Sequence, residues 1–272
     1  MLTSAQLDEN EKQNRRKQLL QRQDRMEQEI REIDMHVFQS RVDQKIEKQI
    51  FYIQQRFGIR FHDMFKETFN PTTITESGKA GIEQLKKAMV HLLDYAGYEL
   101  LQEVRATGLR VEKFMNDTLH EFEAGIYEKI HVIDPEVTLS ELEKQDFKTP
   151  DFQQPFTALT PADFRSAFAG YKGTKAFFAK KQKEQMKDNI FHLLTAPMEE
   201  YLHLSGEQMQ AAYQEQLVQK LKNGRDLFIK EIAAYVDNSL AAMAGDINAD
   251  TLLKKQQRLQ EILEGGDAGN EK

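Results

Sequence analysis

The stretch FGIRFHDMFKETFNP, residues 57–71, decides the fold class of this chain. Phe57, Phe61, Phe65 and Phe69 recur at every fourth position, which places four rings on one stripe of an α-helix. The Asn-Pro pair that follows ends the helix, because the residue before a proline disfavours the helical conformation. Two interpretations of the stripe remain open: packing against another helix in the core, or an exposed tip that contacts a membrane or a partner.

The composition favours helix well beyond this stretch. Only 6 prolines and 14 glycines occur among 272 residues, so few helix breakers interrupt a sequence rich in Gln, Glu, Lys, Leu and Ala. The 17 phenylalanines and 10 methionines supply the bulk for a core. We therefore predict an all-α fold, an elongated bundle of long antiparallel helices that forms a coiled-coil-like stalk.

Apolar periodicity and helix-stop signals set the expected boundaries. The expected helices are 7–70, 79–132, 161–204, 208–243 and 249–263, with a Ser-Gly pair at 205–206 separating the third from the fourth. An irregular connection at 134–161 holds four of the six prolines and a short helical candidate at 139–144. Within this scheme, residues 1–25 are a polar mobile extension, 26–263 the stalk and 264–272 a disordered tail.

A second apolar pattern precedes the phenylalanine stripe. Met26, Ile30, Ile33 and Val37 alternate steps of four and three, a spacing typical of a coiled-coil seam. The seam predicts a partner surface, either for a second copy of the chain or for another protein.

A basic-aromatic cluster follows residue 171. Its members are Lys172, Lys175, Phe177, Phe178, Lys180, Lys181 and Lys183. Such a cluster is either a solvated helix face or a contact for anionic lipid. No window approaches the roughly 20 apolar residues that a membrane-spanning helix needs, so we expect any membrane contact to be peripheral.

Net charge and cysteine content exclude several classes. The formal charge of −7 argues against nucleic acid as a partner, because binding to phosphates requires clustered Lys and Arg. The chain has no cysteine, which excludes disulfides and thiolate metal sites and fits a reducing compartment. The N-terminus shows no signal-peptide pattern. We expect a cytoplasmic protein, with the inner face of the cell membrane as its peripheral site.

We find no motif that predicts catalysis, a cofactor or a bound metal. The nearest approach to a phosphate-binding loop, residues 170–175, has the wrong spacing. The seven histidines form no ligand pair, and Glu200 with His203 gives the Glu-x-x-His spacing of di-iron bundles once, where the site requires it twice. An enzymatic site would have to lie in the irregular connection at 134–161. We expect no enzyme.

Two stretches resemble a known family. FYIQQR at 51–56 and RFHDMFKETFNP at 60–71 resemble the helical region after the GTPase domain of large bacterial dynamin-like proteins. FAGYKGTKAFF at 168–178, followed by a Lys/Glu-rich helix, looks like the C-terminal stalk of the same family. The resemblance covers most of residues 40–265. It implies membrane remodelling, tethering or fusion on the cytoplasmic side, with self-assembling stalk helices and a hydrophobic tip touching lipid.

The chain also departs from that family. Members hydrolyse GTP through a P-loop and switch motifs, and this sequence contains neither. The resemblance therefore implies the stalk alone, as a C-terminal fragment or as a protein whose GTPase domain is encoded separately. The alternative is a freestanding coiled-coil adaptor that binds a protein partner through the seam at residues 26–37.

Overall fold

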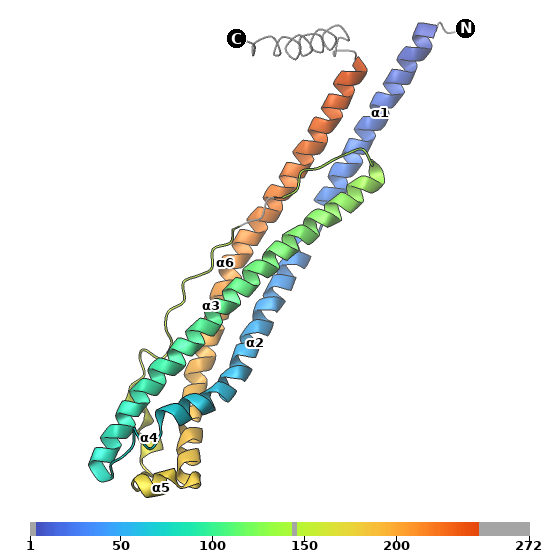
Figure 1. The fold of residues 1–272 in the computed structure, drawn as a ribbon. Coiled ribbons are helices and arrows are strands. Elements are labelled where there is room, and N and C mark those ends of the chain that lie inside the picture. The colour runs from blue at the N-terminus through green and yellow to red at the C-terminus, as the bar shows by residue number, and fades with distance from the viewer. Residues whose placement is uncertain (1–3, 143–145, 245–272) are drawn as a thin grey trace, which may run out of the picture. The chain divides into compact units, whose positions relative to one another are not determined.

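The computed structural model of the chain is all-α, as the composition predicts. It describes residues 4–142 and 146–244, with side chains from Asn10 onward except those of Lys180 and Ala244. Every regular element in this part of the chain is helical (Figure 1). These elements are α1 Ser4–Arg31, α2 Met35–Thr68, α3 Gly78–Ile133, η1 Pro161–Phe164, α4 Arg165–Phe168, α5 Thr174–Phe178 and α6 Lys180–Ala244. The expected helix at 249–263 and tail at 264–272 lie outside the described residues.

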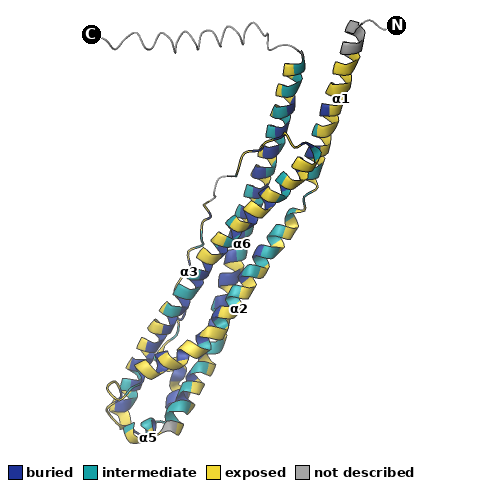
Figure 2. Ribbon diagram, turned by 45° about the vertical axis from the view of Figure 1, so that its right-hand side comes forward, coloured by how far each residue is buried: buried dark blue, intermediate teal, exposed yellow. Residues whose placement is uncertain are grey.

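The chain forms two compact units, and the two longest helices contribute to both. Unit 1 contains α1, the part of α3 from Leu119 and the part of α6 from Lys220. Unit 2 contains α2 together with the preceding parts of α3 and α6, as well as the short helices η1, α4 and α5. Buried positions recur along one side of each long helix (Figure 2), which is the pattern expected of amphipathic helices that share a core.

In unit 2, α2 runs antiparallel to α3. The Arg60 guanidinium lies 2.6 Å from the Glu99 carboxylate, and that of Arg56 lies 3.6 Å from Glu103. Residue numbers therefore rise on α3 as they fall on α2. Both arginines are about half exposed, so the pairs fix the register of the two helices more than they add stability.

Helix α2 is also antiparallel to α6. Gln54 donates to Glu199 at 2.9 Å, and near the start of α6 the Lys187 ammonium lies 3.3 Å from the His62 ring nitrogen. This pairing agrees with the predicted antiparallel bundle.

Helices α3 and α6 are parallel in unit 2, which the prediction of antiparallel helices missed. Tyr171, which precedes α5 and α6, donates its hydroxyl to the carbonyl of Glu76, which precedes α3. Further along both helices, the Tyr213 hydroxyl donates to the carbonyl of Gly108 at 3.2 Å. Parallel neighbours cannot be joined by a tight turn, and in the sequence residues 134–160 separate the end of α3 from the short helices that precede α6.

Unit 1 has its own core and its own ion pairs. The Lys129 ammonium lies 2.5 Å from Glu29, and Arg22 lies 3.3 Å from the buried carboxylate of Asp134, which makes α1 antiparallel to α3 here. The ring of Tyr127 meets that of Phe228 edge-on, with centroids 6.3 Å apart. These contacts join α1, α3 and α6 within the unit.

The expected continuous helix at 7–70 is wrong, because residues 32–34 interrupt it. The Glu32 amide still bonds the carbonyl of Gln28, but that of Ile33 bonds Ile30, so the last turn tightens and stops. Asp34 precedes the first residue of α2, a position that aspartate favours. Neither proline nor glycine marks this break, and sequence reasoning therefore missed it.

The expected break at 205–206 is also wrong, since α6 continues through Ser205 and Gly206. Ser205 is buried and Gly206 faces Ile50 of α2, so these small residues serve helix packing. Conversely, the expected long helix from Pro161 is divided: η1, α4 and α5 precede α6. Gly173 adopts φ of 113° before α5, a conformation that favours glycine and ends the preceding segment.

We call residues 134–142 and 146–160 the strap. In its first part, the Leu142 amide donates to Glu123 at 2.9 Å, and the Tyr127 hydroxyl donates to the carbonyl of Leu139. Helix side chains thus satisfy backbone groups that the expected short helix at 139–144 would have paired internally, and residues 139–142 are not helical. In the second part, the rings of Phe147, Phe152 and Phe156 are buried.

Two glycines of α3 admit the strap. A Cβ atom on Gly97 would lie 2.9 Å from the carbonyl oxygen of Pro155, and one on Gly108 would lie 2.6 Å from the methyl group of Thr149. Both distances are shorter than an ordinary contact. Each glycine is roughly 1 kcal/mol less favourable in a helix than alanine, but a larger residue at either position would collide with the strap.

We predict that Gly97→Ala destabilises the protein by about 1 kcal/mol or more, because the clash with strap backbone outweighs the helix propensity gained. The matched control is Gly125→Ala, also in α3, where nothing lies within 4 Å of the added methyl group. The control should stabilise by up to about 1 kcal/mol. Urea unfolding followed by circular dichroism measures both changes. Equal stabilisation by the two substitutions would contradict the strap's close approach.

The buried phenol of Tyr213 makes the stability of the fold decrease at alkaline pH. Burial raises its pKa from the usual 10.0 to about 12. The unfolded chain therefore loses this proton first, so the contribution of Tyr213 to stability is complete below pH 10.0 and is lost as the pH rises through about 12. We expect the Tyr213→Phe variant to lose less stability than the parent between these limits. Urea midpoints measured across the range test this, and equal losses in both proteins would contradict it.

Candidate interaction surfaces

The phenylalanine stripe lies in the core of unit 2. Phe57, Phe61, Phe65 and Phe69 are each at most 4% exposed. Phe65 and Phe69 stack with centroids 4.6 Å apart, and Phe61 lies 5.1 Å from Phe191 of α6. The structure therefore agrees with the core interpretation of the stripe and not with an exposed tip.

The expected seam is not one continuous surface. Met26 and Ile30 are fully buried in unit 1, whereas Ile33 falls in the interruption between α1 and α2. Val37 belongs to α2 and is 53% exposed. Because the helix ends at Arg31, the alternating spacing of the four residues does not produce one stripe.

The basic-aromatic cluster divides into buried rings and exposed lysines. Phe177 is fully buried, and its ring meets that of Tyr171 edge-on at 5.8 Å. Lys172, Lys175 and Lys181 are exposed. The side chain of Lys180 lies outside the described residues. The rings thus hold the segment in place and the lysines face outward.

Lys183 connects the cluster to the phenylalanine stripe. Its ammonium lies 5.9 Å from the ring centroid of Phe65 and 5.5 Å from that of Phe178, both within reach of a cation–π contact. Desolvation by burial lowers its pKa, partly offset by the neighbouring Glu184. The two segments that resemble dynamin-like proteins, about 100 residues apart in sequence, therefore meet at this side chain.

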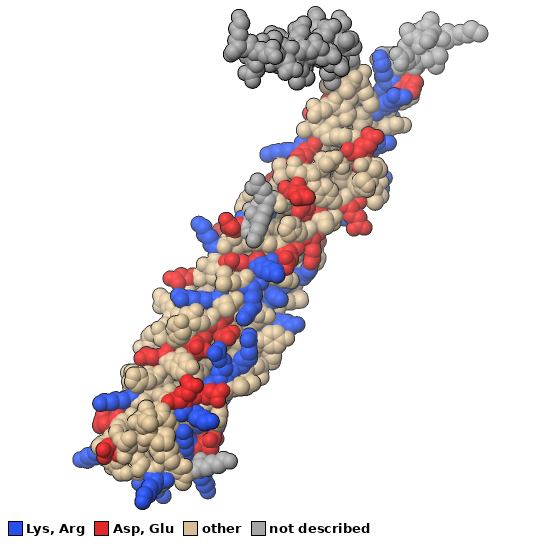
Figure 3. Space-filling view, viewed as in Figure 1, with Lys and Arg blue, Asp and Glu red and all other residues tan. Residues whose placement is uncertain are grey.

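The same end of unit 2 carries a local positive charge. Residues 161–187 hold seven Lys or Arg against two Asp or Glu, in a chain where acids outnumber bases 44 to 37. The Thr174 amide donates to the hydroxyl of Ser77, which brings the start of α3 and its exposed Lys79 beside α5. We call the exposed Lys79, Lys172, Lys175 and Lys181 the basic end. Blue side chains are visible at the α5 end of the molecule in Figure 3.

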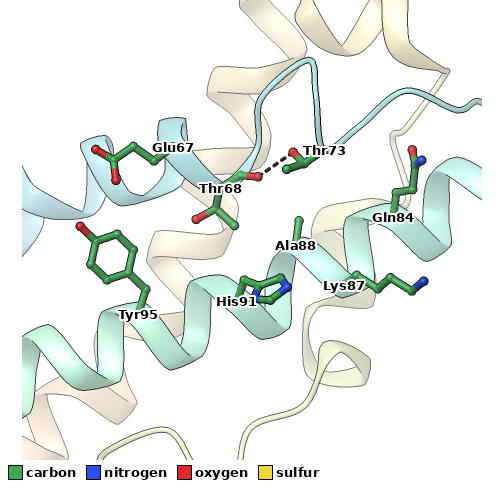
Figure 4. Close-up of a pocket in the computed structure, with 8 residues that line it drawn as sticks. All are labelled: Glu67, Thr68, Thr73, Gln84, Lys87, Ala88, His91 and Tyr95. Carbon is green, nitrogen blue, oxygen red and sulfur yellow. Dashed lines mark hydrogen bonds between the residues drawn. The ribbon is translucent and has the colours of Figure 1, made fainter.

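A cleft of about 540 Å³ lies between the end of α2 and the first turns of α3 (Figure 4). Glu67 and Tyr95 line one end and Gln84 and Lys87 the other, with His91 between the two ends. The Glu67 carboxylate raises the pKa of Tyr95. The side-chain oxygen of Gln84 already accepts hydrogen bonds from the backbone amides of residues 75 and 76. The cleft combines opposite charges and does not define one class of ligand.

Among the side chains that the structure describes, no grouping of three His, Asp or Glu could hold a metal ion. The expected Glu200 and His203 are both exposed, and His203 instead contacts Glu207 at 3.4 Å. Across the described part of the chain, no helix combines the length and apolar character needed to cross a bilayer.

Compared with protein-family models, curated proteins and solved structures, the sequence and fold give no significant match. The resemblance to dynamin-like proteins thus rests on the two quoted stretches and stays a prediction.

We predict that Phe65→Ala destabilises the protein by about 3–5 kcal/mol, because it removes a fully packed ring from the core of unit 2. Ile59→Ala, on the same helix at a position 73% exposed, should change stability by less than about 0.5 kcal/mol. Chemical denaturation of both variants gives the comparison. Similar small effects would restore the exposed-tip interpretation.

Proposed function

We propose that this chain is the stalk and assembly module of a dynamin-like protein that remodels, tethers or fuses membranes from their cytoplasmic side. The observation that carries the proposal is the meeting of the two family-like stretches at Lys183, where both pack into one end of unit 2. GTP hydrolysis belongs to a domain that this sequence does not contain. That domain is either another part of a longer protein or a separately encoded partner. The role of these helices is mechanical.

The proposed membrane contact is the basic end. The four rings of the phenylalanine stripe are buried and unavailable for insertion, which leaves the exposed Lys79, Lys172, Lys175 and Lys181 to meet anionic headgroups. Each lysine near an anionic surface contributes about 1 kcal/mol, and the attraction decays within a Debye length. Binding should therefore be peripheral and sensitive to salt.

The packing of unit 2 suits a mechanical role. The buried stripe joins α2 to α6 through Phe61 and Phe191, and to the strap through Phe57 and Phe156. Closely packed interiors transmit strain. A force applied at the basic end would therefore move the helices of unit 2 together.

We predict that the purified chain co-sediments with vesicles containing anionic lipid at low salt and is released at moderate salt. The variant Lys172→Glu/Lys175→Glu/Lys181→Glu should lose at least about tenfold in affinity, since each reversal replaces an attraction with a repulsion. The matched control Lys17→Glu/Lys113→Glu/Lys222→Glu alters the net charge equally at exposed sites elsewhere. Circular dichroism confirms that both variants fold.

Equal loss in the control would attribute binding to overall charge and reject the basic end as the contact. If neither the parent chain nor the control binds vesicles, the membrane role is rejected.

The second candidate is the freestanding adaptor that binds a protein partner. Because Met26 and Ile30 are buried, the expected seam is not available as the binding surface of such an adaptor. A different observation favours a protein partner: Phe51, Tyr52 and Ile59 of α2 are between 42% and 73% exposed. Absence of vesicle binding, together with a defined complex through this face, would favour the adaptor.

A further inference from the structure

The outer side of α2 is a basic and apolar face. The residues Gln44, Lys48, Phe51, Tyr52, Gln55, Ile59, His62 and Lys66 are all exposed. At about 100° per residue they fall within an arc of about 100°. None is acidic, and Glu47 and Asp63 lie at the two edges of the arc. We call these eight residues the α2 basic face.

The outer side of α6 in the same unit has the opposite character. No Lys or Arg occurs from Asp188 to Gln219, a run of more than eight helical turns. The exposed residues Leu193, Ala196, Glu200, Leu204, Glu207, Ala211 and Glu215 also fall within an arc of about 100°. We call them the α6 acidic face.

The two faces match in length and in chemistry. Each spans 22 residue steps, from 44 to 66 and from 193 to 215, or about 33 Å of helix. The large apolar side chains Phe51 and Ile59 on one face correspond to Leu193 and Leu204 on the other, and all four are exposed. Lysines border the first set and glutamates the second. Complementary charge around an apolar centre is the usual construction of a protein interface.

We propose that the α2 basic face of one copy of this chain binds the α6 acidic face of a second copy. This inference rests on the proposed assembly role and names its surfaces. Because the faces belong to different helices of one unit, the contact is heterologous. In a bound pair, one copy keeps a free α6 acidic face and the other a free α2 basic face, so assembly continues into a ring or a filament.

The contact is weak for each pair of copies. A helix face about 33 Å long and about 10 Å wide covers roughly 330 Å² on each partner, less than half of the usual 800 Å². Association should therefore be weak and depend strongly on protein concentration, and it should weaken further as salt screens the charges.

Sedimentation velocity of the purified chain, from about 10 µM to about 1 mM without lipid, tests the proposal. Two variants reverse one face each: Lys48→Glu/Lys66→Glu leaves both faces acidic, and Glu200→Lys/Glu207→Lys leaves both basic. Each variant alone should associate at least about tenfold more weakly than the parent, because like charges oppose the contact. Mixed in equal amounts, they should regain association, since acidic faces of one then meet basic faces of the other.

Lys113→Glu/Lys222→Glu is the matched control, which changes the charge as much as the α2 variant does at exposed sites outside both faces. It should associate like the parent. A parent chain that stays monomeric at every concentration, a single-face variant that associates normally, or a mixture that stays monomeric would each overturn the proposal.

The outcome is independent of the membrane test. The variant Lys172→Glu/Lys175→Glu/Lys181→Glu should lose vesicle binding and keep association, whereas the single-face variants should keep vesicle binding and lose association. Vesicle binding that survives in the Lys172→Glu/Lys175→Glu/Lys181→Glu variant would reject the basic end as the lipid contact. Association that survives in the single-face variants would reject the contact between copies.

Discussion

Burial of the phenylalanine stripe, which consists of three rings of α2 and of Phe69 directly after it, is the constraint on which unit 2 depends. The rings face α6 at Phe191 and the strap at Phe156, so one stripe of one helix organises two other segments. The ion pairs of Arg56 and Arg60 with α3 then set the register on the adjacent side. With these two sides of α2 occupied, its remaining side is left to solvent and available to a partner.

The strap solves a problem created by the parallel arrangement of α3 and α6. Parallel helices cannot be joined by a short turn, and the returning chain must satisfy its backbone groups along the way. Side chains of the helices do this, as Gln216 shows by both accepting from and donating to the backbone of Lys148. The strap is thus part of the core as much as a connection.

Local sequence patterns predicted the all-α class, a helix at 79–132 that the structure has at Gly78–Ile133, and a helix stop at Asn70 that the structure has at Thr68, because each has a local physical cause. The interruption at 32–34 carries no proline or glycine, and the glycine at 206 faces a neighbouring helix, so both required tertiary contacts to interpret. Burial of the phenylalanine stripe was one of two predicted alternatives. The acidic run from Asp188 to Gln219 was readable in the sequence, but its meaning depends on which residues α2 leaves exposed.

The division of the chain has a consequence for the order of events during synthesis. Unit 2 is complete in sequence at Gln219, whereas unit 1 combines α1 with residues from Leu119 and from Lys220 onward. Its ion pairs join residues 100 and 112 positions apart, so their formation must await closure of long loops. As the polypeptide leaves the ribosome, α1 emerges before the parts of α3 and α6 that complete unit 1, and the α6 part is the last to reach it. Until then its apolar side, with Met26 and Ile30, is open to other binding partners such as chaperones.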